Sequence, residues 1–173
     1  MAFAATPDVL AVDWTEYEKI SRAVCQQVKT RQAYGGLVMA QLMLVTEAQL
    51  TVISSQIKLD GMAHDVQTMI VGSEFERDGL ARSILETILS ARTALGEEGG
   101  RLDRLMEEMQ LDIRISARSV TPPGYPLRVL RRRCRQSFDA TKEAVQRTLD
   151  VLLEQNEGLV RMPVDRLFTL PSP

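Results

Sequence analysis

Apolar side chains recur every three or four residues along most of this chain, and no segment alternates in the manner of a β-strand. The longest such run starts at Leu127 and continues in steps of three and four to Leu152. This spacing places one apolar face along an α-helix. The run follows residues 121–126, where three prolines in five positions end any preceding helix. The sequence therefore predicts an all-α chain with a long C-terminal amphipathic helix.

Capping patterns and glycines predict where the other helices begin and end. Asp13 and Ser73 each stand three positions before a glutamate, a pairing typical of helix N-termini. Glycines at 35–36, 61, 96–100 and 158 predict helix ends or interruptions. These signals predict helices over about 14–33, 37–60, 73–95, 102–115 and 127–155, with 62–71 as a short helix or an extension. Short glycine-containing turns favour antiparallel neighbours, so we expect an antiparallel bundle of four to five helices.

The chain is expected to form one domain. Its 173 residues are an ordinary length for a single domain, and its 45% apolar and 25% charged residues match globular averages. We expect residues 1–12 to be a leader, residues 13–157 to form the helical bundle, and residues 158–173 to be an irregular tail. The proline-rich segment 121–126 is the clearest break within the bundle.

The segment from Leu37 to Ile57 is the most apolar part of the chain. Glu47 is the only charged side chain between Arg31 and Lys58. Polar residues such as Gln41 interrupt the stretch of roughly 20 apolar residues that a membrane-spanning helix needs. We therefore expect the central helix of a bundle or a seam between subunits, and no integral membrane span.

The N-terminus and the cysteines indicate in which cellular compartment the protein is expected. No basic region followed by an apolar run of signal-peptide length begins the sequence, so a cytoplasmic location is expected, with secretion independent of a cleaved signal left open. Cys25 and Cys134 lie on or beside apolar stripes and are expected to be buried, free thiols. With two cysteines and one histidine, and no phosphate-binding glycine loop, we expect neither a metal nor a cofactor, nor an enzyme.

The single histidine suggests one alternative function. The segment Met62–Met69, which contains His64 and Asp65, resembles the phosphoacceptor box of sensor kinases and histidine phosphotransfer bundles. That resemblance implies a nucleophilic imidazole on an exposed bundle face, with the neighbouring acid assisting. The Lys-Gly pair usual after the phosphotransfer histidine is missing, and Met69 stands where sensor kinases usually have proline. Histidine phosphotransfer through His64 is thus an alternative reading.

An arginine cluster opens the long C-terminal helix and supplies the candidate binding residues. They are Tyr125, Arg128, Arg131, Arg132, Arg133 and Arg135. Positive charge near a helix N-terminus opposes the helix macrodipole, so a compensating negative charge is expected. It could come from the net-acidic residues 1–120, from an acidic protein partner, or from nucleic acid or an anionic membrane. Aromatic side chains are few nearby and the net charge is −2, so nucleic acid is not favoured.

The leading functional hypothesis follows from what is present and what is missing. Catalytic constellations are lacking, whereas stripes such as 127–152 exceed what a small bundle easily hides, and methionines at 39, 43, 62, 69 and 106 suit adaptable apolar contacts. We expect a non-enzymatic helical interaction protein, an adaptor, chaperone or component of an assembly such as a secretion apparatus. Its partners would be protein helices, including further copies of itself.

Overall fold

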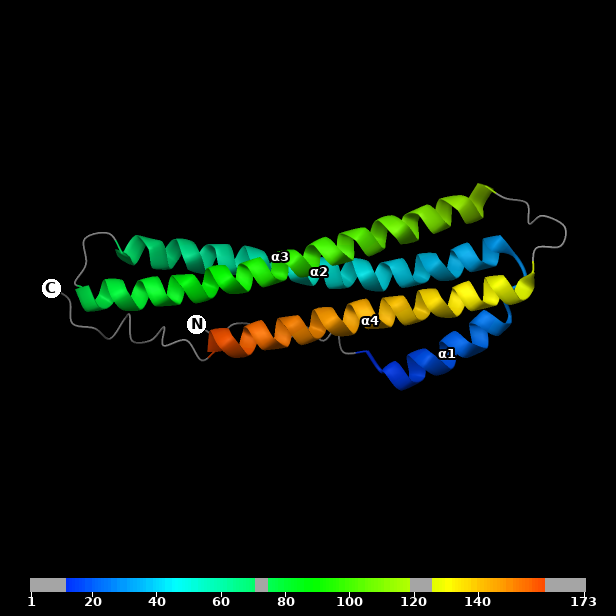
Figure 1. The fold of residues 1–173 in the computed structure, drawn as a ribbon, viewed down its shortest axis with the longest axis horizontal. Coiled ribbons are helices and arrows are strands. Elements are labelled where there is room, and N and C mark those ends of the chain that lie inside the picture. The colour runs from blue at the N-terminus through cyan, green and yellow to red at the C-terminus, as the bar shows by residue number, and fades with distance from the viewer. Residues whose placement is uncertain (1–11, 71–74, 119–125, 161–173) are drawn as a thin grey trace.

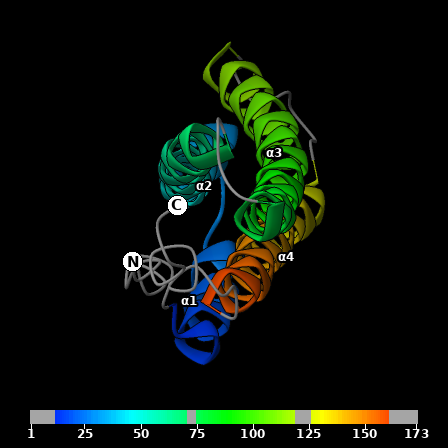
Figure 2. The same ribbon diagram turned by 90° about the vertical axis from the view of Figure 1, so that its left-hand side faces the viewer.

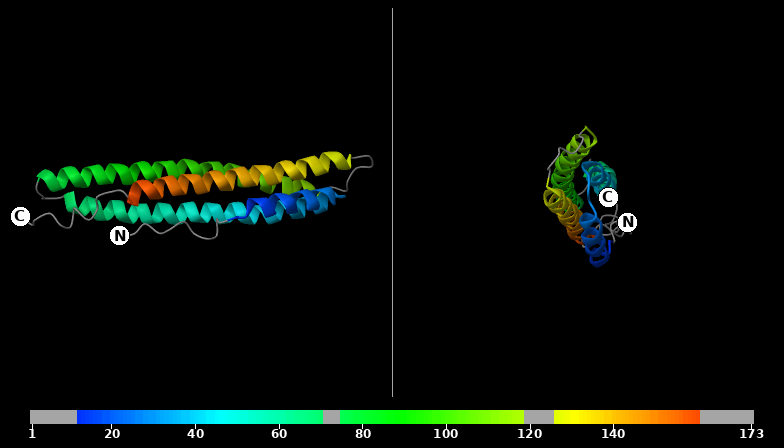
Figure 3. Two further views of the ribbon diagram at one scale, coloured as in Figure 1. Left: turned by 90° about the horizontal axis from the view of Figure 1, so that it is seen from below. Right: turned by 90° about the vertical axis from the view of Figure 1, so that its right-hand side faces the viewer.

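The computed structural model describes residues 12–70, 75–118 and 126–160, and these residues form four helices and no strand. The helices are α1 (Trp14–Gln26), α2 (Arg31–Ile70), α3 (Phe75–Arg118) and α4 (Leu127–Val160). The three long helices lie side by side with successive ones running in opposite directions, and short α1 lies along α4 (Figure 1). Seen from below, the helices form an elongated, narrow rod (Figure 3). The expected all-α class and the packed helical bundle are confirmed.

A seven-residue repeat of buried side chains holds the long helices together. Buried positions follow one another in alternating steps of three and four, apart from one step of seven on α2 and one on α3, and this is the spacing by which helices interlock in coiled coils. They are Val38, Gln41, Val45, Ala48, Val52 and Leu59 on α2; Ala81, Ile84, Ile88, Ala91, Leu95, Glu98, Leu102 and Met109 on α3; and Cys134, Phe138, Thr141, Val145, Thr148 and Leu152 on α4. Most of the stripe over 127–152 is therefore core, with Leu127 exposed at its start, and the expectation that the bundle could not hide the stripe is wrong.

Several glycines lie inside helices that they were expected to end. Helix α2 continues through Gly35, Gly36 and Gly61, and α3 continues through 96–100. A Cβ atom added to Gly35 would lie 2.8 Å from the Cβ of Ser116, so this glycine lets α2 approach α3 closely. The predicted turn at 96–100 and the separate helix over 102–115 are wrong, because the buried repeat of α3 continues through this region in register. Residues 62–70 extend α2.

The predicted start of the first helix agrees with the structure, which describes its capping side chain. The Asp13 carboxylate accepts hydrogen bonds from the amides of Thr15 and Glu16, each at 3.1 Å. The first helix ends at Gln26 rather than near 33, because a connector with buried Val28 intervenes and Thr30 caps α2, accepting from the Ala33 amide at 3.0 Å. Helix α4 starts after Pro126 and runs past Gly158 to Val160, so the expected stop there is wrong. Four of the predicted features lie outside the described residues, wholly or in large part. They are the leader up to residue 11, the cap at Ser73, most of the break at 121–126, and the tail over 161–173.

Candidate functional site

Five large apolar side chains line the side of α2 that faces away from the core. Met39, Met43, Leu50, Ile53 and Ile57 are between 44% and 67% exposed. Together with Thr46 they follow one another in steps of four and three, and we call these six residues the outer stripe. A helix turns about 100° per residue, so the outer stripe lies roughly opposite the buried positions of α2. Helix α2 thus carries two coiled-coil faces, of which one is packed and the other is exposed.

Helix α2 itself is almost uncharged along the outer stripe. Glu47 is the only charged residue within the length of the stripe. On the α3 side, the Gln49 amide donates to the Asp103 carboxylate. Figure 2 views the bundle from one end and shows α3 and α4 on one side of α2, with no described helix covering its opposite side. The outer stripe is therefore a largely apolar surface of the described chain.

Helix α2 is also long and apolar enough to cross a membrane, judged by length and composition alone. Only 33% of its most apolar 18-residue window is buried inside the bundle. The expectation that the chain has no integral membrane span stays a prediction.

The arginine cluster of α4 divides between two sides of the helix. Arg133 points to α3 and α2, where its Nη2 donates to Asp112 Oδ1 at 3.1 Å and its guanidinium lies 5.5 Å from the Tyr34 ring centre. The Tyr34 hydroxyl donates to Asp112 Oδ2 at 2.9 Å. Burial, and then this bond, raise the pKa of Tyr34 to about 12. Arg133 is therefore a structural tie between helices, and Asp112, from the acidic part of the chain, is its partner.

The other four arginines line the groove between α4 and the end of α1. Arg128, Arg132 and Arg135 are exposed, and Arg131 is half-buried, with its Nε donating to the carbonyl oxygen of Val28 at 3.4 Å. With Cys25 and Gln26 these arginines enclose a hollow of about 470 Å³, which we call the arginine groove. An adjoining hollow of about 380 Å³ shares two of the arginines and adds Arg22, together with the acidic side chains Glu18 and Asp139. Tyr125, the remaining candidate, lies outside the described residues.

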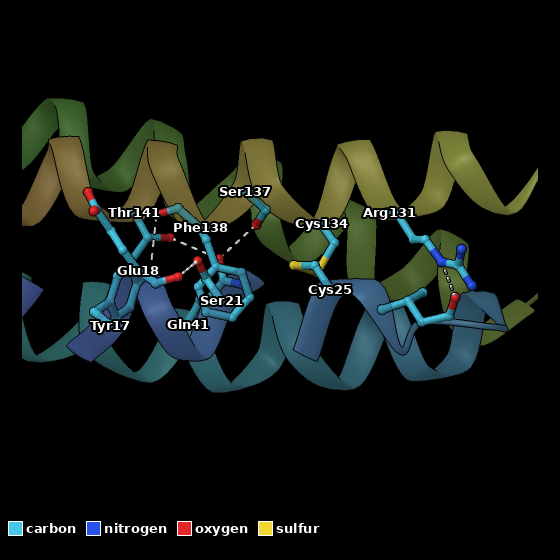
Figure 4. The surroundings of a disulfide bond; sticks show 11 residues. Tyr17, Glu18, Ser21, Cys25, Gln41, Arg131, Cys134, Ser137, Phe138 and Thr141 are labelled. Atoms are coloured by element: carbon cyan, nitrogen blue, oxygen red, sulfur yellow. Dashed lines mark hydrogen bonds between the residues drawn. A yellow bond between two sulfur atoms is a disulfide. The ribbon is translucent and has the colours of Figure 1, made fainter. Parts of the chain in front are cut away.

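A disulfide closes one wall of the arginine groove. Cys25 on α1 and Cys134 on α4 are bonded, with their Cα atoms 5.6 Å apart, a normal separation for a disulfide (Figure 4). Both cysteines are buried, as expected, but the prediction of free thiols is wrong. That prediction relied on the 109-residue separation in sequence and on the lack of an export signal. Neither observation shows that α4 comes back to lie along α1.

Polar contacts at the other end of α1 complete its attachment to α4. Trp14 Nε1 donates to Gln146 Oε1 at 2.6 Å, and the Tyr17 hydroxyl donates to the carbonyl oxygen of Phe138 at 3.1 Å. Glu18 forms an ion pair with Lys142, and the hydrogen bond from that lysine lowers the pKa of Glu18. Burial raises the pKa of Tyr17 to about 12. Helix α1 is held mainly by α4.

The structure places His64 on the exposed surface of α2, next to exposed Asp65. No hydrogen bond or ion pair with another described side chain orients its imidazole for proton transfer. Within the three described segments, no group of three or more His, Cys, Asp and Glu side chains could hold a metal ion. Phosphotransfer through His64 stays a prediction without support from the geometry.

Two buried polar residues were not singled out by sequence reasoning. Glu98 is only 1% exposed, and it accepts from Thr148 Oγ1 at 3.1 Å and Arg101 Nη1 at 3.0 Å. Gln41 is also buried, and its Oε1 accepts from Ser137 and Thr141 while its Nε2 has no partner among the described residues. Their signal in the sequence is their position in the seven-residue repeat. Such polar layers favour one alignment of helices over others.

Comparisons with protein-family models, with curated proteins and with solved structures find no match to this chain.

Proposed function

We propose that this protein is a non-enzymatic helical interaction protein, an adaptor, chaperone or assembly component, which binds an amphipathic helix along the outer stripe. The observation that carries this proposal is the exposure of Met39, Met43, Leu50, Ile53 and Ile57 in coiled-coil spacing. Large apolar side chains that are exposed singly need no explanation, but a continuous apolar face on a folded chain marks an interaction surface.

The spacing favours a helix as the bound element. Steps of four and three keep apolar side chains in line with a helix packed alongside, each inserting between side chains of the partner. From Met39 to Ile57 the outer stripe is about 27 Å long, enough for five turns of a partner helix. The two methionines at one end add side chains that adapt to differently shaped partners. The partner's facing side should be apolar and its flanks nearly uncharged, since Glu47 alone offers a charge.

Site-specific photo-crosslinking in the native host tests this proposal. A photoreactive residue at position 43, 50 or 57 should give the same discrete crosslinked product, whether with another copy or with a different protein. Leu89, Leu111 and Leu153 are exposed apolar residues on other faces and serve as matched control positions. Crosslinking to lipid alone at the outer stripe, or equal crosslinking from the control positions, would contradict helix binding.

A variant that introduces positive charge into the outer stripe gives the second readout. Leu50→Lys combined with Ile57→Lys should abolish the crosslink from position 43 and leave the melting temperature almost unchanged, because surface substitutions usually alter stability by less than about 0.5 kcal/mol. Leu89→Lys combined with Leu111→Lys is the matched control and should keep the crosslink.

The disulfide favours an oxidising compartment as the place of action. Structural disulfides persist in secreted or periplasmic proteins and are rare in a reducing cytoplasm. The cytoplasmic location expected from the sequence stays a prediction, and we propose the oxidising alternative. Alkylating cell extracts under acid-quenched conditions tests it: native protein without free thiols supports the proposal, and two alkylated cysteines contradict it.

A further inference from the structure

The arginine groove gathers four arginines of α4 against the end of α1, a helix far from α4 in sequence. Arg128, Arg132 and Arg135 follow one another on α4 in steps of four and three, so their side chains share one face of the helix. Arg131 borders the same hollow, and Arg22 reaches the adjoining one from α1. The disulfide fixes α1 against α4 at this point, which holds the walls of the groove in place (Figure 4).

The groove arginines form no ion pair among the described residues, although Glu18 and Asp139 line the adjoining hollow that Arg132 and Arg135 share. Arg128, Arg132 and Arg135 have no ion-pair or hydrogen-bond partner among the described residues, whereas Arg92, Arg101 and Arg147 on other surfaces contact carboxylates. Arg131 contacts a backbone carbonyl, which is neutral. These arginines also stand in the first turns of α4, where the macrodipole adds positive potential. A bound anion would remove this unfavourable arrangement.

The groove favours a compact anion over an extended one. From Arg128 to Arg135 the basic face is only about 10.5 Å long. The next hollows along the α1–α4 surface, the first of which shares Arg132 and Arg135, are lined by Glu18, Asp139, Glu143 and Asp150. These carboxylates would repel a longer acidic helix or a nucleic acid strand. The hollow of about 470 Å³ is within the usual range for small-molecule sites. Several charges on one small ligand are needed to match converging guanidinium groups, and their forked geometry pairs with phosphate oxygens.

We propose that the arginine groove binds a compact ligand carrying two or more phosphate groups. Soluble oligophosphates and the headgroup of a lipid with two phosphates share this chemistry. The site is separate from the outer stripe, and its test does not depend on helix binding.

Isothermal titration of the full-length, oxidised protein with inorganic tripolyphosphate tests the site, and flotation with cardiolipin vesicles tests the lipid source. One saturable site is expected with at least one probe at physiological salt. The variant Arg128→Gln/Arg132→Gln/Arg135→Gln should weaken that binding at least about tenfold, since charge-assisted bonds to the phosphates are lost. It should keep the helical circular dichroism signal and the melting temperature, because it removes charges that oppose the α4 macrodipole.

Arg82→Gln/Arg104→Gln/Arg114→Gln is the matched control. It makes the same change in net charge on exposed arginines of α3 and should keep binding within about twofold of the wild type, because it leaves every groove arginine in place. Binding of tripolyphosphate alone assigns a soluble ligand, and vesicle binding that tripolyphosphate displaces assigns a headgroup. Equal weakening in both triple variants, or no saturable binding to either probe, overturns the proposal.

Discussion

Neighbouring glycines in α2 have opposite structural roles. A Cβ atom on Gly35 would lie 2.8 Å from Ser116 Cβ, while one on Gly36 would meet no atom within 4 Å. Gly35→Ala should therefore push α2 from α3 and lower the free energy of unfolding by about 1–3 kcal/mol. Gly36→Ala should raise it by about 0.5–1 kcal/mol, because glycine inside a helix costs conformational entropy on folding. Urea unfolding followed by circular dichroism measures both values.

A second-site change separates the close approach from helix propensity. Ser116→Gly removes the Cβ atom that Gly35→Ala would meet. The double variant should regain part of the stability lost by Gly35→Ala. Equal stabilisation by Gly35→Ala and Gly36→Ala would show that α2 and α3 do not approach as closely as described.

Tyr34 makes the fold sensitive to alkaline pH. Burial and the bond to Asp112 raise its pKa from 10.0 to about 12, so the folded state holds the neutral phenol. Between these values the unfolded chain releases the proton and the folded chain keeps it, so stability should fall as pH rises from 10 to 12. Tyr17, also with a pKa raised to about 12, adds a similar contribution.

Absorbance of the tyrosinate form, together with urea unfolding at pH 9 and 11, tests this prediction. Tyr34→Phe should remove one late-titrating group and reduce the loss of stability between the two pH values. The loss of stability that remains in this variant should come from Tyr17. An unchanged pH dependence in Tyr34→Phe would show that its phenol ionises equally well in the folded protein.

At the scale of helices, α1 is the element most dependent on a single covalent bond. It packs mainly on α4, and outside the disulfide it is held by the polar and aromatic contacts around Trp14, Tyr17 and Glu18 and by half-buried Val24. Elements with few buried contacts unfold locally before the rest. Reduction of the Cys25–Cys134 bond should therefore release α1 at a lower denaturant concentration than the α2–α4 bundle.

Trp14 reports this release because it is the only tryptophan. In the oxidised protein, tryptophan emission and circular dichroism should change together during urea unfolding. In the reduced protein, or in Cys25→Ser/Cys134→Ser, the emission change should come first. Coincident transitions in both forms would mean that the noncovalent contacts of α1 suffice to keep it on α4.

The periodic pattern predicted the helices better than the glycines predicted their ends. The spacing of apolar residues indicated the buried face of α4, since a helical face is a property of local sequence. Gly35, Gly96 and Gly99 were interpreted as interruptions, although the buried repeat runs through them in register. Whether an interior glycine ends a helix or admits a neighbouring helix depends on what packs there, as Ser116 does at Gly35. The Cys25–Cys134 pairing depends on the same tertiary information.

At the scale of the whole molecule, the arrangement of helices decides which apolar face stays exposed. The sequence marked 127–152 as the excess stripe and showed residues 37–57 as apolar on nearly all sides. The structure buries the first and divides the second into a packed face and the outer stripe. A helix with two apolar faces leaves one face exposed only if the bundle has too few helices to surround that helix. Local periodicity contains no information about the number of layers around a helix.

The rod shape that leaves this face uncovered can be measured directly. Helix α3 spans 44 residues, about 66 Å at 1.5 Å per residue. A uniform rod of that length has a radius of gyration of about 19 Å, whereas a compact globule of this chain length has one of about 16 Å. Small-angle X-ray scattering extrapolated to zero concentration should give the larger value for the monomer. A value near 16 Å would mean that the long helices fold back on themselves, which would enclose the outer stripe and remove the basis for helix binding.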